Sequence, residues 1–94
     1  MALISKVMCT NQREHQDPHE RITHIGGVNT DGTHWKLAES AAIVGTENGR
    51  YRFYVNLGGK RVLVTVAMHQ GRKYLKTTAD GDAPNNLLNL PGCP

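Results

Sequence analysis

Two adjacent glycines, Gly58 and Gly59, separate two runs of alternating apolar and polar residues, and no other feature constrains the fold as strongly. A Gly-Gly pair suits a type I′ turn, because both central positions of that turn need a positive φ. The turn predicts four cross-strand pairs: Leu57 with Lys60, Val55 with Val62, Phe53 with Val64, and Tyr51 with Val66. The last three pairs are apolar on both strands, so turn chemistry and hydrophobic pattern agree on one register.

A second tight turn, at Gln70 and Gly71, adds a third strand to this hairpin. It predicts three pairs: His69 with Arg72, Ala67 with Tyr74, and Val66 with Leu75. One face of the three strands is then apolar and forms the core face: Tyr51, Phe53, Val55, Val62, Val64, Val66 and Leu75. The opposite face is mixed: Arg52, Tyr54, Asn56, Arg61, Leu63, Thr65, Tyr74 and Lys76.

The first part of the chain predicts two further strands. Residues 2–10 alternate, with one side formed by Leu3, Val7 and Cys9 and the other by Ile4, Lys6 and Met8. Residues 21–25 predict a second strand, which ends at Gly26 and Gly27. Between them, residues 11–20 are polar and contain a proline, so we expect a mobile loop there.

Residues 35–48 predict the main helix, after a turn within residues 28–34. One helical face carries three apolar residues, Leu37, Ala41 and Val44. Gly49 follows the helix as a C-terminal stop. Gly45 within the helix weakens it by about 1 kcal/mol relative to alanine, so we expect the helix to depend on packing against the sheet.

Together these elements predict one small α+β domain over residues 1–94. We expect an antiparallel β-meander of about five strands in the order β-β-α-β-β-β, with the helix and Trp35 packed on one face. After a turn, residues 79–94 form a C-terminal tail that folds back on the core through three leucines, Leu87, Leu88 and Leu90. A chain this short buries roughly 60–65% of its surface, which leaves little room for a deep pocket.

The two cysteines, Cys9 and Cys93, lie near opposite ends of the chain and form no Cys-x-x-Cys pair, which argues against a structural zinc finger. The N-terminal residues lack the continuous apolar stretch of a signal peptide, and no apolar run approaches the roughly 18 residues of a membrane helix. We therefore predict a cytoplasmic protein without a membrane segment, in which both cysteines are free thiols.

Basic residues are concentrated in the second half of the chain. Residues 1–47 hold four Lys/Arg and six Asp/Glu, whereas residues 48–94 hold seven and two. All seven of these bases lie within residues 50–76, which contain no acid. Cations beside aromatic rings on a sheet face are typical of surfaces that bind single strands. We therefore predict an anionic partner (nucleic acid, nucleotide or acidic protein surface) on five residues: Arg52, Tyr54, Arg61, Tyr74 and Lys76.

Lys and Arg also protect sheet edges and cover apolar side chains, so the alternative is a solvated face without a ligand. A second hypothesis is a structural or self-associating, homodimeric protein with no small-molecule ligand. The strand at residues 2–10 has no assigned partner within the chain, and an exposed strand edge is a ready dimer site.

The histidines do not have the spacing of a metal site. His15 and His19 flank Pro18, which argues against a helix that presents both rings. A zinc site would need convergence in space of residues that are distant in sequence, such as His24, His34 and Cys9. We therefore expect no metal.

The polar residues of the C-terminal tail also predict structural roles rather than a metal-binding or catalytic site. Asp80 and Asp82 lack the later ligands of a calcium loop, and we expect Asn85 and Asn86 to be turn and cap residues. No catalytic motif is present, and Cys9 with a histidine is the one formal pair of nucleophile and base. We expect no enzyme activity and no cofactor.

Four stretches of the sequence resemble a known family: residues 21–27 (RITHIGG), 53–55 (FYV), 74–77 (YLKT) and 80–91 (DGDAPNNLLNLP). The chain resembles an uncharacterised family of short bacterial proteins that is catalogued as a domain of unknown function. The C-terminal tail is the most specific part of the resemblance. The helix at 38–47 departs from the family pattern, and residues 11–20 have no counterpart in it. The resemblance implies a bacterial or phage-related source and a compact fold, and it implies no activity.

Overall fold

The computed structural model describes residues 3–14, 16–81 and 84–94. These residues form an α+β fold, as predicted, with seven strands where we expected about five. In chain order the elements are β1 (Leu3–Lys6), β2 (Cys9–Gln12), the 3-10 helix η1 (Pro18–Glu20), β3 (Ile22–Val28), β4 (His34–Ala38), α1 (Glu39–Glu47), β5 (Tyr51–Leu57), β6 (Lys60–His69), β7 (Arg72–Thr77) and α2 (Asn85–Leu88). The loop predicted at residues 11–20 thus begins inside β2 and ends in η1, and its mobility stays a prediction.

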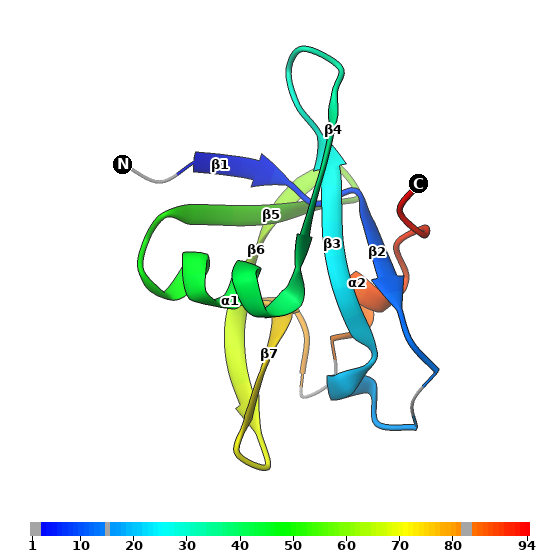
Figure 1. The fold of residues 1–94 in the computed structure, drawn as a ribbon, viewed down its shortest axis with the longest axis vertical. Coiled ribbons are helices and arrows are strands. Elements are labelled where there is room, and N and C mark those ends of the chain that lie inside the picture. The colour runs from blue at the N-terminus through cyan, green and yellow to red at the C-terminus, as the bar shows by residue number, and fades with distance from the viewer. Residues whose placement is uncertain (1–2, 15, 82–83) are drawn as a thin grey trace.

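The strands form two sheets, in the orders β1-β5-β6-β7 and β2-β3-β4 (Figure 1). β1 runs parallel to β5, and the other neighbouring strands are antiparallel. The single strand predicted over residues 2–10 is therefore wrong, because the chain changes sheets at Val7 and Met8. The Val7 amide donates to the Tyr54 carbonyl at 2.8 Å, and the Met8 amide donates to the Gly26 carbonyl at 2.8 Å.

β3 continues through Gly26 and Gly27, where we predicted its end. Both glycines are buried and permit close approach of their neighbours. A Cβ atom at Gly26 would lie 2.7 Å from the Trp35 carbonyl oxygen and 2.9 Å from Cys9 Sγ. A Cβ atom at Gly27 would lie 2.8 Å from Trp35 Nε1. Glycine inside a strand marks such an approach, so the interpretation of this pair as a stop is wrong.

The helix begins later than predicted, because the residues before Glu39 form β4 against β3. The predicted apolar stripe is wrong as well: Leu37 lies in β4, and Ala41 and Val44 are exposed. The buried residues of α1 are Glu39, Ala42, Ile43 and Gly45. The end of the helix agrees with the prediction, since Gly49 follows it with φ +80°.

Both predicted hairpin turns are confirmed. Gly58 and Gly59 have φ values of +57° and +86°, and Gln70 and Gly71 have φ values of +51° and +78°. The β5–β6 ladder pairs four residues of each strand: Tyr54 with Leu63, Val55 with Val62, Asn56 with Arg61, and Leu57 with Lys60. The two further pairs that we predicted, Phe53 with Val64 and Tyr51 with Val66, lie beyond the end of this ladder. The β6–β7 pairs include all three that we predicted: His69 with Arg72, Ala67 with Tyr74, and Val66 with Leu75.

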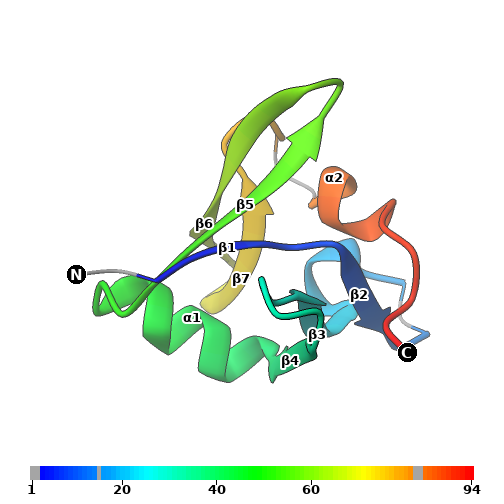
Figure 2. The same cartoon turned by 90° about the horizontal axis from the view of Figure 1, so that it is seen from above.

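The core lies between the two sheets, α1 and the C-terminal residues. Its buried members come from every part of the chain: Val7, Ile22, Ile25, Ala42, Ile43, Phe53, Val55, Val64, Leu75 and Leu87. Seen from above, α1 packs along one side of β5 and β6, and the tip of their hairpin extends away from it (Figure 2). The predicted core face of the three-stranded meander therefore packs inward. Its opposite face is exposed at Arg52, Arg61 and Leu63, whereas Tyr74 on β7 is buried.

A disulfide between Cys9 and Cys93 joins the C-terminal residues to β2. The prediction of two free thiols is wrong, because the fold brings together residues that are 84 positions apart in sequence. The Thr10 amide donates to the Pro91 carbonyl at 3.0 Å beside the bond. A cross-link of this span stabilises a fold by roughly 4–5 kcal/mol in the chain-entropy model. The cytoplasmic location stays a prediction; among the described residues, no helix has the length and apolarity to cross a membrane.

Candidate functional site

The outward face of β1, β5 and β6 combines cations, a tyrosine and exposed apolar side chains. In the parallel pairing of β1 with β5, Ile4 lies beside Arg52 and Lys6 lies beside Tyr54. In the antiparallel pairing of β5 with β6, Leu63 lies opposite Tyr54. We call this surface the cationic face, and its members are Ile4, Lys6, Arg52, Tyr54, Arg61 and Leu63. Side chains of neighbouring strands that lie side by side share one face of a sheet, so the topology itself assembles this surface.

Tyr54 and Arg61 form the centre of the cationic face. The guanidinium carbon of Arg61 lies 4.5 Å from the centroid of the Tyr54 ring, which is a cation–π contact. Arg52 and Arg61 are exposed. Within the described part of the chain, no carboxylate lies at ion-pair distance from Lys6, Arg52 or Arg61. Arg52 and Arg61 are therefore exposed, with the half-buried Lys6 on the same face, and none of the three has a paired carboxylate among the described residues.

A groove runs beside the cationic face, between β1 and the β3–β4 hairpin. It has a volume of about 460 Å³ and is lined by Ile4, Ser5, Lys6, Met8, Val28, Asn29, Thr30, Trp35 and Tyr54. Ile4, Met8 and Val28 are exposed apolar residues there. Tyr54 belongs both to the groove and to the cationic face, so a flat apolar group in the groove would lie beside the cations.

Two of the five predicted binding residues do not join this surface. Tyr74 is only 4% exposed, and its ring packs edge-on against the His19 ring with centroids 4.7 Å apart. The prediction of an exposed Tyr74 is wrong, because η1 lies over this end of β7. Lys76 uses its Nζ to donate to the carbonyl oxygens of Asp80 at 3.2 Å and Gly81 at 3.1 Å.

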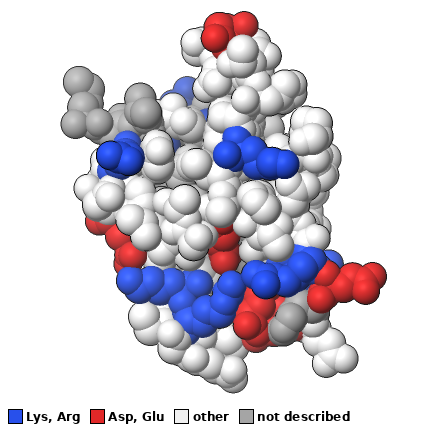
Figure 3. Space-filling model, in the orientation of Figure 1, with Lys and Arg blue, Asp and Glu red and all other residues white. Residues whose placement is uncertain are grey.

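The other two bases of β7 form ion pairs. Arg72 donates to Glu39 Oε1 at 3.2 Å and to the His19 carbonyl at 2.8 Å, and Lys73 Nζ lies 2.9 Å from Glu47 Oε2. Burial raises the pKa of the Glu39 carboxyl above its ordinary value, and the charge of Arg72 opposes that rise. On the face that carries α1, the basic groups accordingly form a band with acidic groups beside it (Figure 3).

Cys9 and Asp80, which were also considered as site residues from the sequence, have structural roles. Cys9 is part of the disulfide, so it is neither a zinc ligand nor a nucleophile. The Asp80 carboxylate accepts from the Thr77 amide at 3.1 Å and from the Asn86 amide at 3.2 Å, as a turn and cap residue does. Residues 15 and 82 lie outside the described ranges.

The sequence did not reveal Lys6, Ile4 or the groove. The parallel pairing that brings β1 beside β5 leaves no local signal, because no turn connects the two strands. The cluster of Asp17, His19 and His69 was also missed, since the third residue comes from a distant strand. Absence of enzyme activity stays a prediction.

Comparison with known proteins gives the family without a function. The family model described as "Protein of unknown function (DUF3892)" matches residues 6–91. The match includes residues 11–20, for which the sequence alone suggested no counterpart. The searches of curated proteins and of solved structures found no match. The chain belongs to the DUF3892 family of proteins of unknown function.

Proposed function

We propose that this chain is a binding module for single-stranded nucleic acid, and that the cationic face with its adjoining groove is the binding surface. The observation that carries the proposal is the position of Tyr54, which lines the groove while Arg61 stacks on its ring. Surfaces that bind single strands combine two elements: cations that follow the phosphates, and planar side chains on which bases stack.

The charges support a linear anion. Lys6, Arg52 and Arg61 come from three neighbouring strands, so they are spread across the sheet rather than gathered at one point. Each cation that neutralises a phosphate releases counterions, and this release drives binding at low salt. An extended strand can follow the cations from one strand of the sheet to the next.

The groove supports stacking. Its exposed apolar residues, Ile4, Met8 and Val28, are poorly suited to contact water and well suited to contact the face of a base. Stacking of one base on an aromatic side chain contributes about 1–3 kcal/mol. The Tyr54→Ala variant should therefore lose roughly 5- to 150-fold in affinity.

Fluorescence anisotropy with a labelled oligothymidylate of about 12 nucleotides tests the proposal, since single-strand sites span about 4–16 nucleotides. Arg61→Glu should reduce affinity at least about tenfold at low salt. Lys36→Glu is the matched control: it changes the net charge equally from an exposed position on β4, outside the groove lining, and should change affinity much less. Circular dichroism checks that each variant is folded.

Binding measurements with two further ligands distinguish a nucleic-acid partner from the other anionic partners. Poly-glutamate of similar length and charge presents the same anionic character without bases, and a mononucleotide presents a base without a chain. Both should bind much more weakly than the oligonucleotide. Equal binding of poly-glutamate, or equal loss in the Arg61→Glu and Lys36→Glu variants, would show that the proposal is wrong.

The edge of β1 favours one alternative function. β1 is an edge strand of its sheet, so a second copy of the chain could pair with its edge. A homodimer formed there would remain dimeric in light scattering at low micromolar concentration. A monomer at high concentration would exclude this alternative and would leave the nucleic-acid proposal unaffected.

A further inference from the structure

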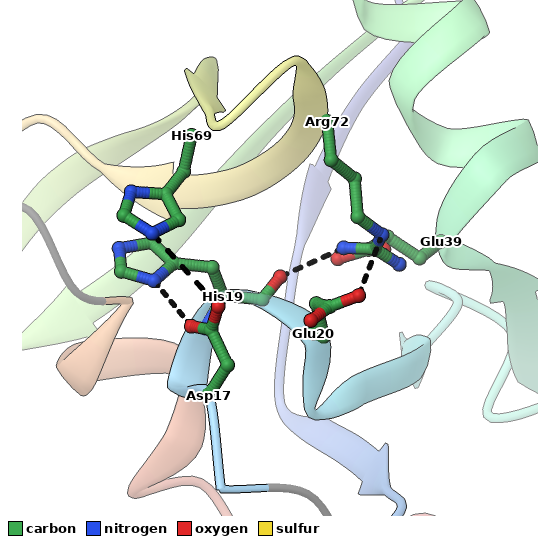
Figure 4. Close-up of polar contacts among 6 residues, drawn as sticks. All are labelled: Asp17, His19, Glu20, Glu39, His69 and Arg72. Carbon is green, nitrogen blue, oxygen red and sulfur yellow. Dashed lines mark hydrogen bonds and ion pairs between the residues drawn. The ribbon is translucent and has the colours of Figure 1, made fainter.

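Three side chains from two distant parts of the chain converge beside η1 (Figure 4). Asp17 precedes η1, His19 lies within it, and His69 ends β6. His19 Nδ1 lies 2.6 Å from Asp17 Oδ1, and His69 Nε2 lies 3.8 Å from Asp17 Oδ2. One nitrogen of each imidazole and one carboxylate oxygen all lie within 4.8 Å of one another.

The surrounding fold fixes these three side chains in place. The His69 ring stacks on the His19 ring with centroids 3.7 Å apart, and the Tyr74 ring packs edge-on against His19. Asp17 caps η1 by accepting from the His19 amide at 3.0 Å. The turn after His69 places Gln70 in the left-handed region, at φ +51°. The His19 side chain is only 11% exposed. The packing therefore keeps the three side chains close together.

Carboxylates and cations both lie around the cluster. The Arg72 guanidinium lies 3.8 Å from Glu20 and 3.2 Å from Glu39, and the charge of Arg13 also acts on Glu39. Hydrogen bonds from the His19 side chain and then from its backbone hold the pKa of the Asp17 carboxyl below its ordinary value. The ionised carboxylate is the form in which aspartate binds a metal ion.

We propose that Asp17, His19 and His69 bind a divalent transition-metal ion, with Zn²⁺ as the first candidate. Two imidazole nitrogens and one carboxylate oxygen form a donor set that Zn²⁺ takes in proteins, with ligand distances of about 2.0–2.2 Å and water in the remaining position. The pocket at this place has a volume of about 70 Å³ and is also lined by Glu20, Gln70 and Arg72. That volume accommodates an ion and a water molecule.

Binding requires a small rearrangement. The Asp17 carboxylate has to move off His19 Nδ1, so that the ion takes the place of the hydrogen-bonded proton between them. The stacked rings have to tilt, since parallel rings direct their nitrogen lone pairs along parallel lines. The bound ion would then connect η1 to the β6–β7 turn and stabilise the segment that leads from β2 to β3.

Calorimetric titration of the untagged, chelator-treated chain with Zn²⁺ tests this inference. We expect one ion per chain, a rise in melting temperature with added Zn²⁺ and no such rise with Mg²⁺, which prefers oxygen ligands. Replacement of Zn²⁺ by Co²⁺ should produce visible absorption bands, and the ring ¹⁵N signals of His19 and His69 should shift on binding.

His69→Gln is the decisive variant, because this side chain is 37% exposed and its loss should leave the fold intact. It should weaken Zn²⁺ binding at least about tenfold. His34→Gln, at an exposed position of β4, is the matched control and should bind as the parent does. Absence of saturable binding by the folded parent, or equal affinity of the parent and the His69→Gln variant, would overturn the inference. Neither result bears on the nucleic-acid proposal, whose residues lie elsewhere.

Discussion

Five of the seven bases in the second half of the chain fall into two groups with different surroundings. On β7, Arg72 pairs with buried Glu39, Lys73 pairs with Glu47, and Lys76 donates to two backbone carbonyls. On β5 and β6, Arg52 and Arg61 are exposed, and no carboxylate of the described residues pairs with them. The first group contacts oxygen atoms of the protein, whereas the second stays exposed.

The difference arises from what each strand lies beside. β7 is the edge strand next to η1, the start of α1 and the turn at residue 80, and each of these offers oxygen atoms. The tip of the β5–β6 hairpin extends away from α1 (Figure 2). A count of charges along the sequence therefore overestimates the basic surface. The position of a base in the sheet decides whether it pairs with a group of the protein or stays exposed.

Removal of Arg72 should have the largest effect. In the Arg72→Met variant, Glu39 remains 7% exposed without its cation, and the free energy of unfolding should fall by about 3 kcal/mol. Urea unfolding at neutral pH measures this loss. The Arg61→Met variant is the control on the other group and should change stability by less than about 0.5 kcal/mol. Equal losses of unfolding free energy in the two variants would show that the bases of β7 do not stabilise the fold more than those of β5 and β6.

The pH dependence of stability should identify Glu39 as the buried partner. Because burial raises its pKa in the folded state, the folded chain binds more protons than the unfolded chain between the ordinary pKa and the raised one. Stability from this group is therefore lost as the pH rises through that window. The parent should lose stability relative to the Glu39→Gln variant from about pH 4.5 upward. A pH-independent difference between the two proteins would contradict this assignment.

Lys73 should show the smallest effect within the first group. Its pair with Glu47 is 46% and 41% exposed at the two side chains, and solvent screens such pairs. The Lys73→Ala variant should lose about 0.5 kcal/mol or less in urea unfolding. A loss as large as that of Arg72→Met would mean that the exposure of a base does not determine how much it contributes to the free energy of unfolding.

Much of the sheet could be predicted from the sequence because its signals are local. Gly58 and Gly59 set a type I′ turn, and the turn fixes the register of the neighbouring strands. The Gln70-Gly71 turn does the same for β6 and β7. The α+β class followed from these hairpins and from one helical stretch.

The remaining features depend on contacts between distant residues. Gly26 and Gly27 have the sequence appearance of a stop, and only the approach of Trp35 and Cys9 explains them as strand residues. The Cys9–Cys93 bond likewise follows from the return of the tail to β2. Strand β4 was mistaken for the first turn of the helix, because a short apolar segment fits both periodicities.

The candidate site was predicted in part. Arg52, Tyr54 and Arg61 follow from the alternation of β5 and β6 and from the register of one hairpin. Tyr74 lies on the same geometric face, but η1 covers it, and a register alone does not show which neighbour packs above a strand. Lys6 was missed because it joins the face through a parallel pairing that no turn encodes.

The salt dependence of oligonucleotide binding tests the central claim most directly. With Lys6, Arg52 and Arg61 on the phosphates, the plot of log affinity against log salt should have a slope of about −2 for a single strand. The slope should become shallower by about 0.7 in Arg61→Ala and should remain unchanged in Lys73→Ala. Absence of binding at low salt, or the same change of slope in both variants, would contradict the account.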